Sequence, residues 1–139
     1  MKIIPATLDQ SNVAITGGTI NGTTIGGTAP VQIQGYMPTN YQTGTTYTLV
    51  LGDSGKRVSL TNASSITLTV PNSSTVAFPA ETEILIRQGG GGQVTITGAV
   101  GVTINSFSSL TKLSGQYAVA CLKLSSTANT WDLFGDLTA

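Results

Sequence analysis

Between residues 46 and 134 the sequence repeats one pattern, in which short runs of alternating apolar and polar residues are separated by turn residues. The run SITLTV at residues 65–70 shows this pattern most clearly, because Ile66, Leu68 and Val70 share one face of an extended strand. Turn signals such as GDSG at residues 52–55 recur about every 8–12 residues. The pattern predicts eight short strands, at residues 46–51, 56–60, 65–70, 82–88, 93–97, 102–105, 116–124 and 130–134.

The composition supports the same fold class. Threonine and serine are abundant, 17 residues are glycine, and only 9% of residues are charged. Residues of these types suit strands and turns better than helices. We therefore expect an all-β protein with a single small domain of the β-sandwich or jelly-roll-like type.

The charge balance excludes several classes of function. Six basic and six acidic residues cancel, which argues against nucleic acid or an anionic membrane surface as a partner. The chain has no histidine, so the commonest general base and metal ligand is missing. Its single cysteine, Cys121, cannot form an intramolecular disulfide or a cysteine cluster. We expect no metal site and no cofactor.

The sequence shows no targeting segment. The start, MKIIPATLDQ, lacks the apolar stretch of a secretory signal, and no run approaches the roughly 18 apolar residues of a membrane span. We expect synthesis in a cytoplasm and no membrane partner.

The first 35 residues differ from the rest and divide into two parts. Residues 1–14 predict an irregular N-terminal arm, whose apolar residues are the candidates for anchoring to a partner: Ile3, Ile4, Leu8 and Val13. Residues 15–35 predict a Gly/Thr-rich stem, and residues 36–139 form the β-domain. Residues 29–45 are interpreted as a connector that contains one short strand at residues 31–34.

The stem segment ITGGTINGTTIGGT allows two interpretations. Asn21-Gly22 is a hairpin signal, but the flanking double glycines leave strands too short to be stable alone. Ile15, Ile20 and Ile25 recur every five residues, and three chains wound together could bury them on a common axis. We prefer the intertwined homotrimeric stem over the hairpin. Its predicted trimer interface comprises Ile15, Ile20, Ile25, Val31 and Ile33.

No residue pattern predicts catalysis. The carboxylates show no spacing that singles out an acid and a nucleophile; they are Asp9, Asp53, Glu81, Glu83, Asp132 and Asp136. Gly89–Gly92 lacks the GK[ST] ending of a phosphate loop and is interpreted as a flexible hairpin turn. Lys56 and Arg57 are interpreted as a solvated strand start. The sequence thus predicts a protein that is not an enzyme.

The aromatic residues divide between core and surface. Trp131 shares a strand face with Leu133, which favours a core or interface position. Tyr36 and Tyr41 lie in the connector, where they are candidates for stacking on a glycan or for packing between subunits. Cys121 is interpreted as a small buried apolar residue.

The chain resembles virion proteins of tailed bacteriophages. The Gly/Thr-rich stem is similar to segments of their fibre and decoration proteins. Residues 51–74, 76–106 and 116–137 resemble a small β-domain that recurs in such proteins. The resemblance implies a homotrimer located in the virion, with the major capsid protein or another virion protein as partner, and no shared catalytic residue.

The short length of the chain favours one kind of virion protein over another. We expect a capsid decoration (cement) or head-fibre protein that binds the capsid lattice. The alternative is a short tail-fibre adhesin that binds a host glycan.

Overall fold

The computed structural model describes residues 36–139 of the chain. This part of the chain contains two 3₁₀ helices, Leu51–Asp53 and Phe107–Ser109, and neither is long and apolar enough to cross a membrane. The remaining ordered structure is eleven strands: β1 Thr39–Gln42, β2 Thr46–Thr48, β3 Arg57–Leu60, β4 Ile66–Val70, β5 Glu83–Gln88, β6 Val94–Gly98, β7 Thr103–Ser106, β8 Lys112–Leu113, β9 Val119–Leu124, β10 Thr130–Gly135 and β11 Leu137–Thr138.

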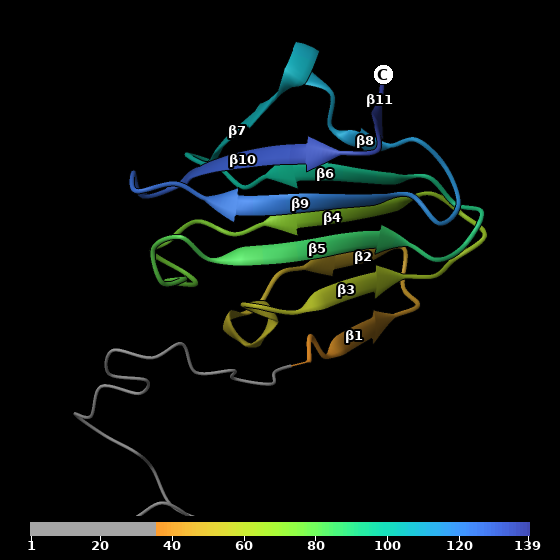
Figure 1. The fold of residues 1–139 in the computed structure, drawn as a ribbon, viewed down its shortest axis with the longest axis horizontal. Coiled ribbons are helices and arrows are strands. Elements are labelled where there is room, and N and C mark those ends of the chain that lie inside the picture. The colour runs from red at the N-terminus through yellow and green to blue at the C-terminus, as the bar shows by residue number, and fades with distance from the viewer. Residues whose placement is uncertain (1–35) are drawn as a thin grey trace, which may run out of the picture. The chain divides into compact units, whose positions relative to one another are not determined.

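The strands form two mixed sheets (Figure 1). The larger sheet has the order β1-β3-β5-β9-β10-β7, and the smaller has the order β11-β8-β6-β4-β2. From β1 to β6 the chain alternates between the sheets, with odd strands in the larger and even strands in the smaller. Each strand from β1 to β4 pairs in parallel with the strand two positions later. The first six strands therefore wind as three stacked coils, β1–β2, β3–β4 and β5–β6.

One hydrophobic core lies between the sheets. Inward positions alternate along the strands, as in β4, where Ile66, Leu68 and Val70 are buried. Trp131 and Leu133 are each only 2% exposed, which confirms the core position predicted for Trp131. Burial of this apolar surface is the main stabilising contribution to the fold.

Threonines occupy the outward positions of the smaller sheet. The strand register forms two columns of threonines across β2, β4 and β6. The first column contains Thr46, Thr67 and Thr95. The second lies two residues further along each strand and contains Thr48, Thr69 and Thr97. Cross-strand threonine pairs pack well on a pleated surface and leave hydroxyls toward water. The alternating threonines of β2, β4 and β6 thus form the outer face of this sheet.

The all-β prediction is confirmed, with differences in the strand path. Each of the eight predicted strands has a counterpart, but β1, β8 and β11 were not expected. Five of the nine strand pairs are parallel, whereas a jelly roll pairs its strands antiparallel. The predicted arm, stem and strand at residues 31–34 lie outside the described residues. The same holds for the residues proposed for them: Ile3, Ile4, Leu8, Val13, Ile15, Ile20, Ile25, Val31 and Ile33.

The prediction of a flexible hairpin at Gly89–Gly92 is wrong. This segment leads from β5 in the larger sheet to β6 in the smaller one. It stacks on the turn of the preceding coil, where the amide of Gly92 donates to the carbonyl of Asn62 at 2.8 Å. A Cβ added at Gly92 would collide with the carbonyl oxygen of Ser64. Gly90 and Gly92 are needed because the two turns approach each other closely.

Substitution within this turn tests that explanation. We expect Gly92→Ala to lower the free energy of unfolding by about 1–3 kcal/mol, because the backbone of Ser64 must move to admit the methyl group. Gly91→Ala is the matched control, since a Cβ at Gly91 meets no atom within 4 Å. Urea unfolding of both variants measures the difference. Equal stability of the two variants would contradict the close-approach explanation.

Candidate functional site

The first coil, which we define as residues 36–51, carries an exposed apolar surface. Nine large apolar side chains are exposed among the described residues, and five of them belong to this coil: Tyr36, Met37, Tyr41, Val50 and Leu51. Tyr36 is 89% exposed and Tyr41 70% exposed. Both strands of the coil, β1 and β2, are outermost in their sheets, so each has one edge without a partner strand among the described residues. Apolar surface and open sheet edges thus occur together.

A buried carboxylate holds the first coil in shape. Asp53, only 1% exposed, ends the 3₁₀ turn that follows β2. Its Oδ1 accepts a hydrogen bond from Asn40 Nδ2 at 2.7 Å in β1. Its Oδ2 accepts from the Tyr47 hydroxyl at 2.9 Å in β2 and from the Val50 amide at 3.0 Å. The turn position of Asp53 was predicted, whereas these long-range partners were not.

The hydrogen-bond network extends to neighbouring side chains. Asn40 Nδ2 also donates to the Tyr47 hydroxyl at 2.8 Å, and Gln42 Nε2 donates to Asn40 Oδ1 at 2.8 Å. Burial of the phenol, with the hydrogen bond to Asp53 second, raises the pKa of Tyr47 from 10.0 to about 12. The network fixes β1 relative to β2, and the exposed rings of Tyr36 and Tyr41 extend from the segment it holds.

A second feature is a pocket of about 140 Å³ beside the C-terminal ends of β4 and β9. One wall comes from the β4–β5 loop, residues 71–82, and the other comes from the β9–β10 turn, residues 125–129, together with the adjoining strand ends. Phe78 and Trp131 form an edge-to-face aromatic pair in the pocket, with ring centroids 5.4 Å apart. The polar lining residues are Ser73, Ser125, Ser126 and Asn129.

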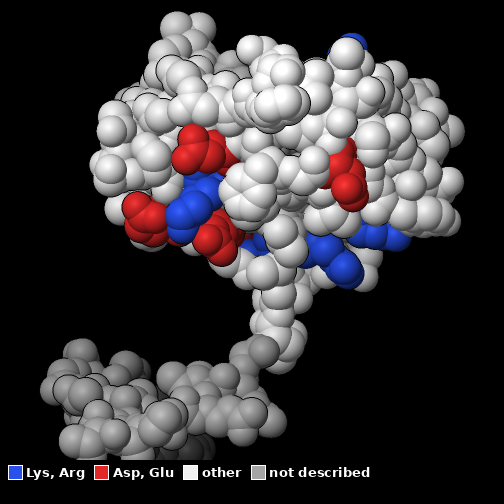
Figure 2. Space-filling model, turned by 45° about the horizontal axis from the view of Figure 1, so that its top comes forward, with Lys and Arg blue, Asp and Glu red and all other residues white. Residues whose placement is uncertain are grey.

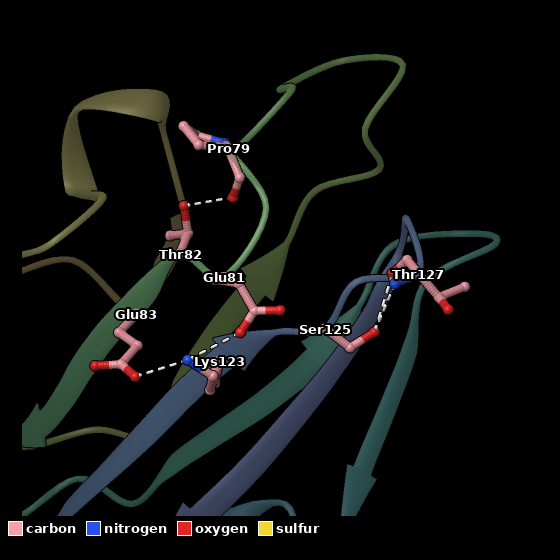
Figure 3. Close-up of polar contacts among 7 residues, drawn as sticks. All are labelled: Pro79, Glu81, Thr82, Glu83, Lys123, Ser125 and Thr127. Carbon is pink, nitrogen blue, oxygen red and sulfur yellow. Dashed lines mark hydrogen bonds and ion pairs between the residues drawn. The ribbon is translucent and has the colours of Figure 1, made fainter.

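Hydrogen bonds hold both walls in place. Asn129, which has a positive φ of 61°, accepts a hydrogen bond from the Ser73 amide through its Oδ1 at 2.7 Å and so joins the two walls. The Ser125 hydroxyl donates to the Thr127 carbonyl at 3.2 Å within the turn (Figure 3). At the end of the β4–β5 loop, the Thr82 hydroxyl donates to the Pro79 carbonyl at 2.7 Å. The pocket is therefore present before any ligand binds.

An ion-pair cluster fastens the same loop to β9. Lys123 Nζ lies 3.2 Å from Glu81 Oε2 and 2.9 Å from Glu83 Oε1 (Figure 3). The hydrogen bonds to Glu83 and Glu81 raise the pKa of Lys123. Both carboxylates are exposed, as expected, but they converge on one ammonium group. Most of the face shown in Figure 2 carries no charged side chain.

The remaining candidates have local structural partners. Arg57 Nε donates to Thr39 Oγ1 at 3.0 Å and joins β3 to β1. Asp132 accepts from Asn105 at 3.3 Å, and Asp136 accepts from the Val119 amide at 3.2 Å. Cys121 is half-buried rather than buried, and desolvation raises the pKa of its thiol.

The comparisons with known proteins assign no family. The sequence matches no model of a protein family, and no curated protein matches it. Among residues 36–139, no group of three or more His, Cys, Asp or Glu side chains is placed to hold a metal ion. The first coil and the aromatic pocket are therefore the two candidate sites. Sequence reasoning identified Tyr36 and Tyr41 in the first, but it missed the pocket.

The raised pKa of Tyr47 predicts a loss of stability at alkaline pH. The unfolded chain releases the phenolic proton near pH 10, whereas the folded chain holds it until about pH 12. The free energy of unfolding should therefore fall as pH rises across this window. Urea unfolding between about pH 9 and pH 11.5 measures this slope. Tyr47→Phe, which lacks the proton, should show a shallower slope; identical slopes would contradict the assignment.

Proposed function

We propose that this chain is a non-enzymatic structural protein of a tailed-bacteriophage virion, a homotrimeric capsid decoration or head-fibre protein that binds the major capsid lattice. The observation that carries the proposal is the first coil, whose apolar side chains and open sheet edges are exposed together. The resemblance of the sequence to phage fibre and decoration proteins indicates the setting. The two sheets and their shared core supply a compact, sandwich-like knob.

Physical reasoning favours a partner on the first coil. An open strand edge can pair with other chains, and proteins usually protect such edges. Stacked coils also need a cap at each end, because every inner coil is covered by its neighbours. Here the terminal coil displays Tyr36, Met37 and Tyr41, and none of residues 36–51 carries a charge that would oppose association. Tyrosine and methionine are enriched where proteins contact each other.

A second copy of the chain is the occupant that we favour. Residues 36–51 directly follow the predicted stem, so a stem that joins three chains at Ile15, Ile20 and Ile25 would bring three first coils near one axis. Assembly would then cover both the coil surface and the stem. A trimer matches three-fold positions of a capsid lattice, and three linked contacts bind far more tightly than one. The apolar arm residues Ile3, Ile4, Leu8 and Val13 are the proposed capsid contacts.

A glycan-binding adhesin is the second candidate. Exposed tyrosine rings stack on sugars as well as on protein, and Tyr36 and Tyr41 are both largely exposed. In that case the first coil would remain open in the assembled protein. The two proposals therefore differ in whether these rings are covered in the trimer.

The oligomeric state of the protein in solution tests the role of the first coil. We expect the full chain to sediment as a trimer. The double variant Tyr36→Ser/Tyr41→Ser should have an association constant at least about tenfold lower, since each buried ring adds binding energy. The control is Phe107→Ser, which removes a ring that is 86% exposed outside the first coil. Sedimentation equilibrium over a range of concentrations gives the association constants of the native protein, the double variant and the control variant.

Three outcomes would decide between the candidates. A monomer at all concentrations would contradict the trimer. Equal association of all three proteins would exclude the first coil as the interface. Binding of the native protein on a glycan array, lost in Tyr36→Ala or Tyr41→Ala with the trimer intact, would favour the adhesin.

Location is tested by counting copies of the chain in purified particles of the phage that encodes it, relative to the major capsid protein. A decoration protein should be present in hundreds of copies, because a shell offers that many lattice positions. A few copies, in a multiple of three, would indicate a tail or a unique vertex and favour the adhesin. Absence from the particle would refute a virion role.

A further inference from the structure

The pocket between the β4–β5 loop and the β9–β10 turn points to a ligand separate from the assembly surface. We propose that it binds one neutral six-membered sugar ring, such as the terminal hexose or N-acetylhexosamine of a glycan. This proposal does not depend on the trimer or on the capsid, and it uses neither Tyr36 nor Tyr41. Size, charge and the placement of polar groups support it.

The size of the pocket fits one ring. Its volume is about 140 Å³. An apolar cavity of roughly 150 Å³ holds one benzene molecule, so this pocket has room for one six-membered ring whose substituents extend toward its open side. The pocket is open to solvent on one side, and its lining includes exposed residues of both walls, among them Ala80 and Ala128. A ring at the end of a longer chain can therefore enter while the rest of the glycan stays in water.

The lining is neutral and combines apolar with polar groups. No charged residue lines the pocket. Phe78 and Trp131 supply aromatic rings, and Ser73, Ser126 and Asn129 supply polar groups, whereas the Ser125 hydroxyl is bonded within its own turn. Sugars present C–H faces to apolar groups and hydroxyls to polar ones, and ligand sites typically combine an apolar lining with a few placed polar groups. A charged sugar would find no counter-charge in the lining.

Trp131 supplies the most specific feature. The residue is only 2% exposed, yet no hydrogen bond of the described residues uses its indole N–H. Among these residues, Ser106 Oγ is the only side-chain polar atom that is both fully buried and without a partner. The indole nitrogen of Trp131 also has no partner, so it is not fully buried and keeps some access to solvent. Because Trp131 lines the pocket, we infer that this access is through the pocket. A sugar hydroxyl placed there would accept the unused hydrogen bond.

The pocket offers a direct readout, since Trp131 is the only tryptophan of the chain. Glucose, galactose, mannose and N-acetylglucosamine are titrated separately into the full-length protein while tryptophan fluorescence is recorded. We expect at least one of them to shift the emission with a dissociation constant on the order of 1 mM, as for other ligands of this size. Glucuronate, which carries a charge, should bind more weakly than glucose. Cyclohexanol is the apolar comparison.

Matched variants assign the signal to the pocket. Ala128→Phe and Ala80→Phe each place a ring at an exposed position of the lining, and we expect either to weaken sugar binding at least about tenfold by filling the pocket. Ala63→Phe is the control, because Ala63 is also exposed but lies in the β3–β4 turn. Circular dichroism verifies that each variant is folded, and having two filling variants protects the test if one does not fold.

Three results would overturn the proposal. The first is the absence of a saturable shift with all four neutral sugars. The second is a shift that Ala128→Phe and Ala80→Phe leave unchanged. The third is binding of cyclohexanol without binding of any sugar, which would make the pocket an apolar cavity only. A shift that the filling variants abolish and Ala63→Phe retains would establish the site, whether or not the protein is a trimer.

Discussion

The structure depends on the close parallel stacking of successive coils. Each coil places one strand in each sheet, and its inward side chains are covered only when the next coil lies directly on it. The turns must stack as closely as the strands, which explains why Gly90 and Gly92 lie against the backbone of residues 62–64. If one coil moved out of register, inward and outward residues would exchange places along its strands.

Stacking also explains why the two ends of the unit differ. After the third coil, β9 pairs with β5 and β8 pairs with β6, both antiparallel, so later parts of the chain cover the third coil and leave β7 and β11 as the edge strands. The first coil has no such covering strand within residues 36–139. The network around Asp53 stabilises that coil internally, but it leaves Tyr36, Met37 and Tyr41 exposed. A rigid coil with an uncovered apolar surface is suited to assembly, since little conformational entropy is lost when it binds.

Local patterns in the sequence were sufficient for the strands and much of the core. Strict alternation identified β4, and the period of two placed Trp131 and Leu133 on one buried face. β1 was missed because TNYQ carries no apolar alternation, and its strand conformation depends on pairing with β3. The glycine run was misinterpreted for a similar reason, since its contacts are with Asn62 and Ser64 in a different coil.

The candidate sites show the same division between local and long-range information. Tyr36 and Tyr41 were identified because a polar, turn-rich context already indicates exposure. The pocket could not be identified, because its walls are distant in the sequence and meet only through the winding of the chain. The partners of Asp53 were missed likewise: a turn aspartate is a local pattern, but Asn40 and Tyr47 approach it only after the first coil has closed.

The central claim, that the first coil is covered by another chain, is tested most directly by hydrogen–deuterium exchange of the full-length protein. The measurement compares peptides that span β1 and β2 with peptides that span β7 and β11, which are the edge strands at the opposite ends of the sheets. If the account is correct, exchange at β1 and β2 slows as protein concentration rises, whereas exchange at β7 and β11 does not change. Fast exchange at β1 and β2 at every concentration would contradict it.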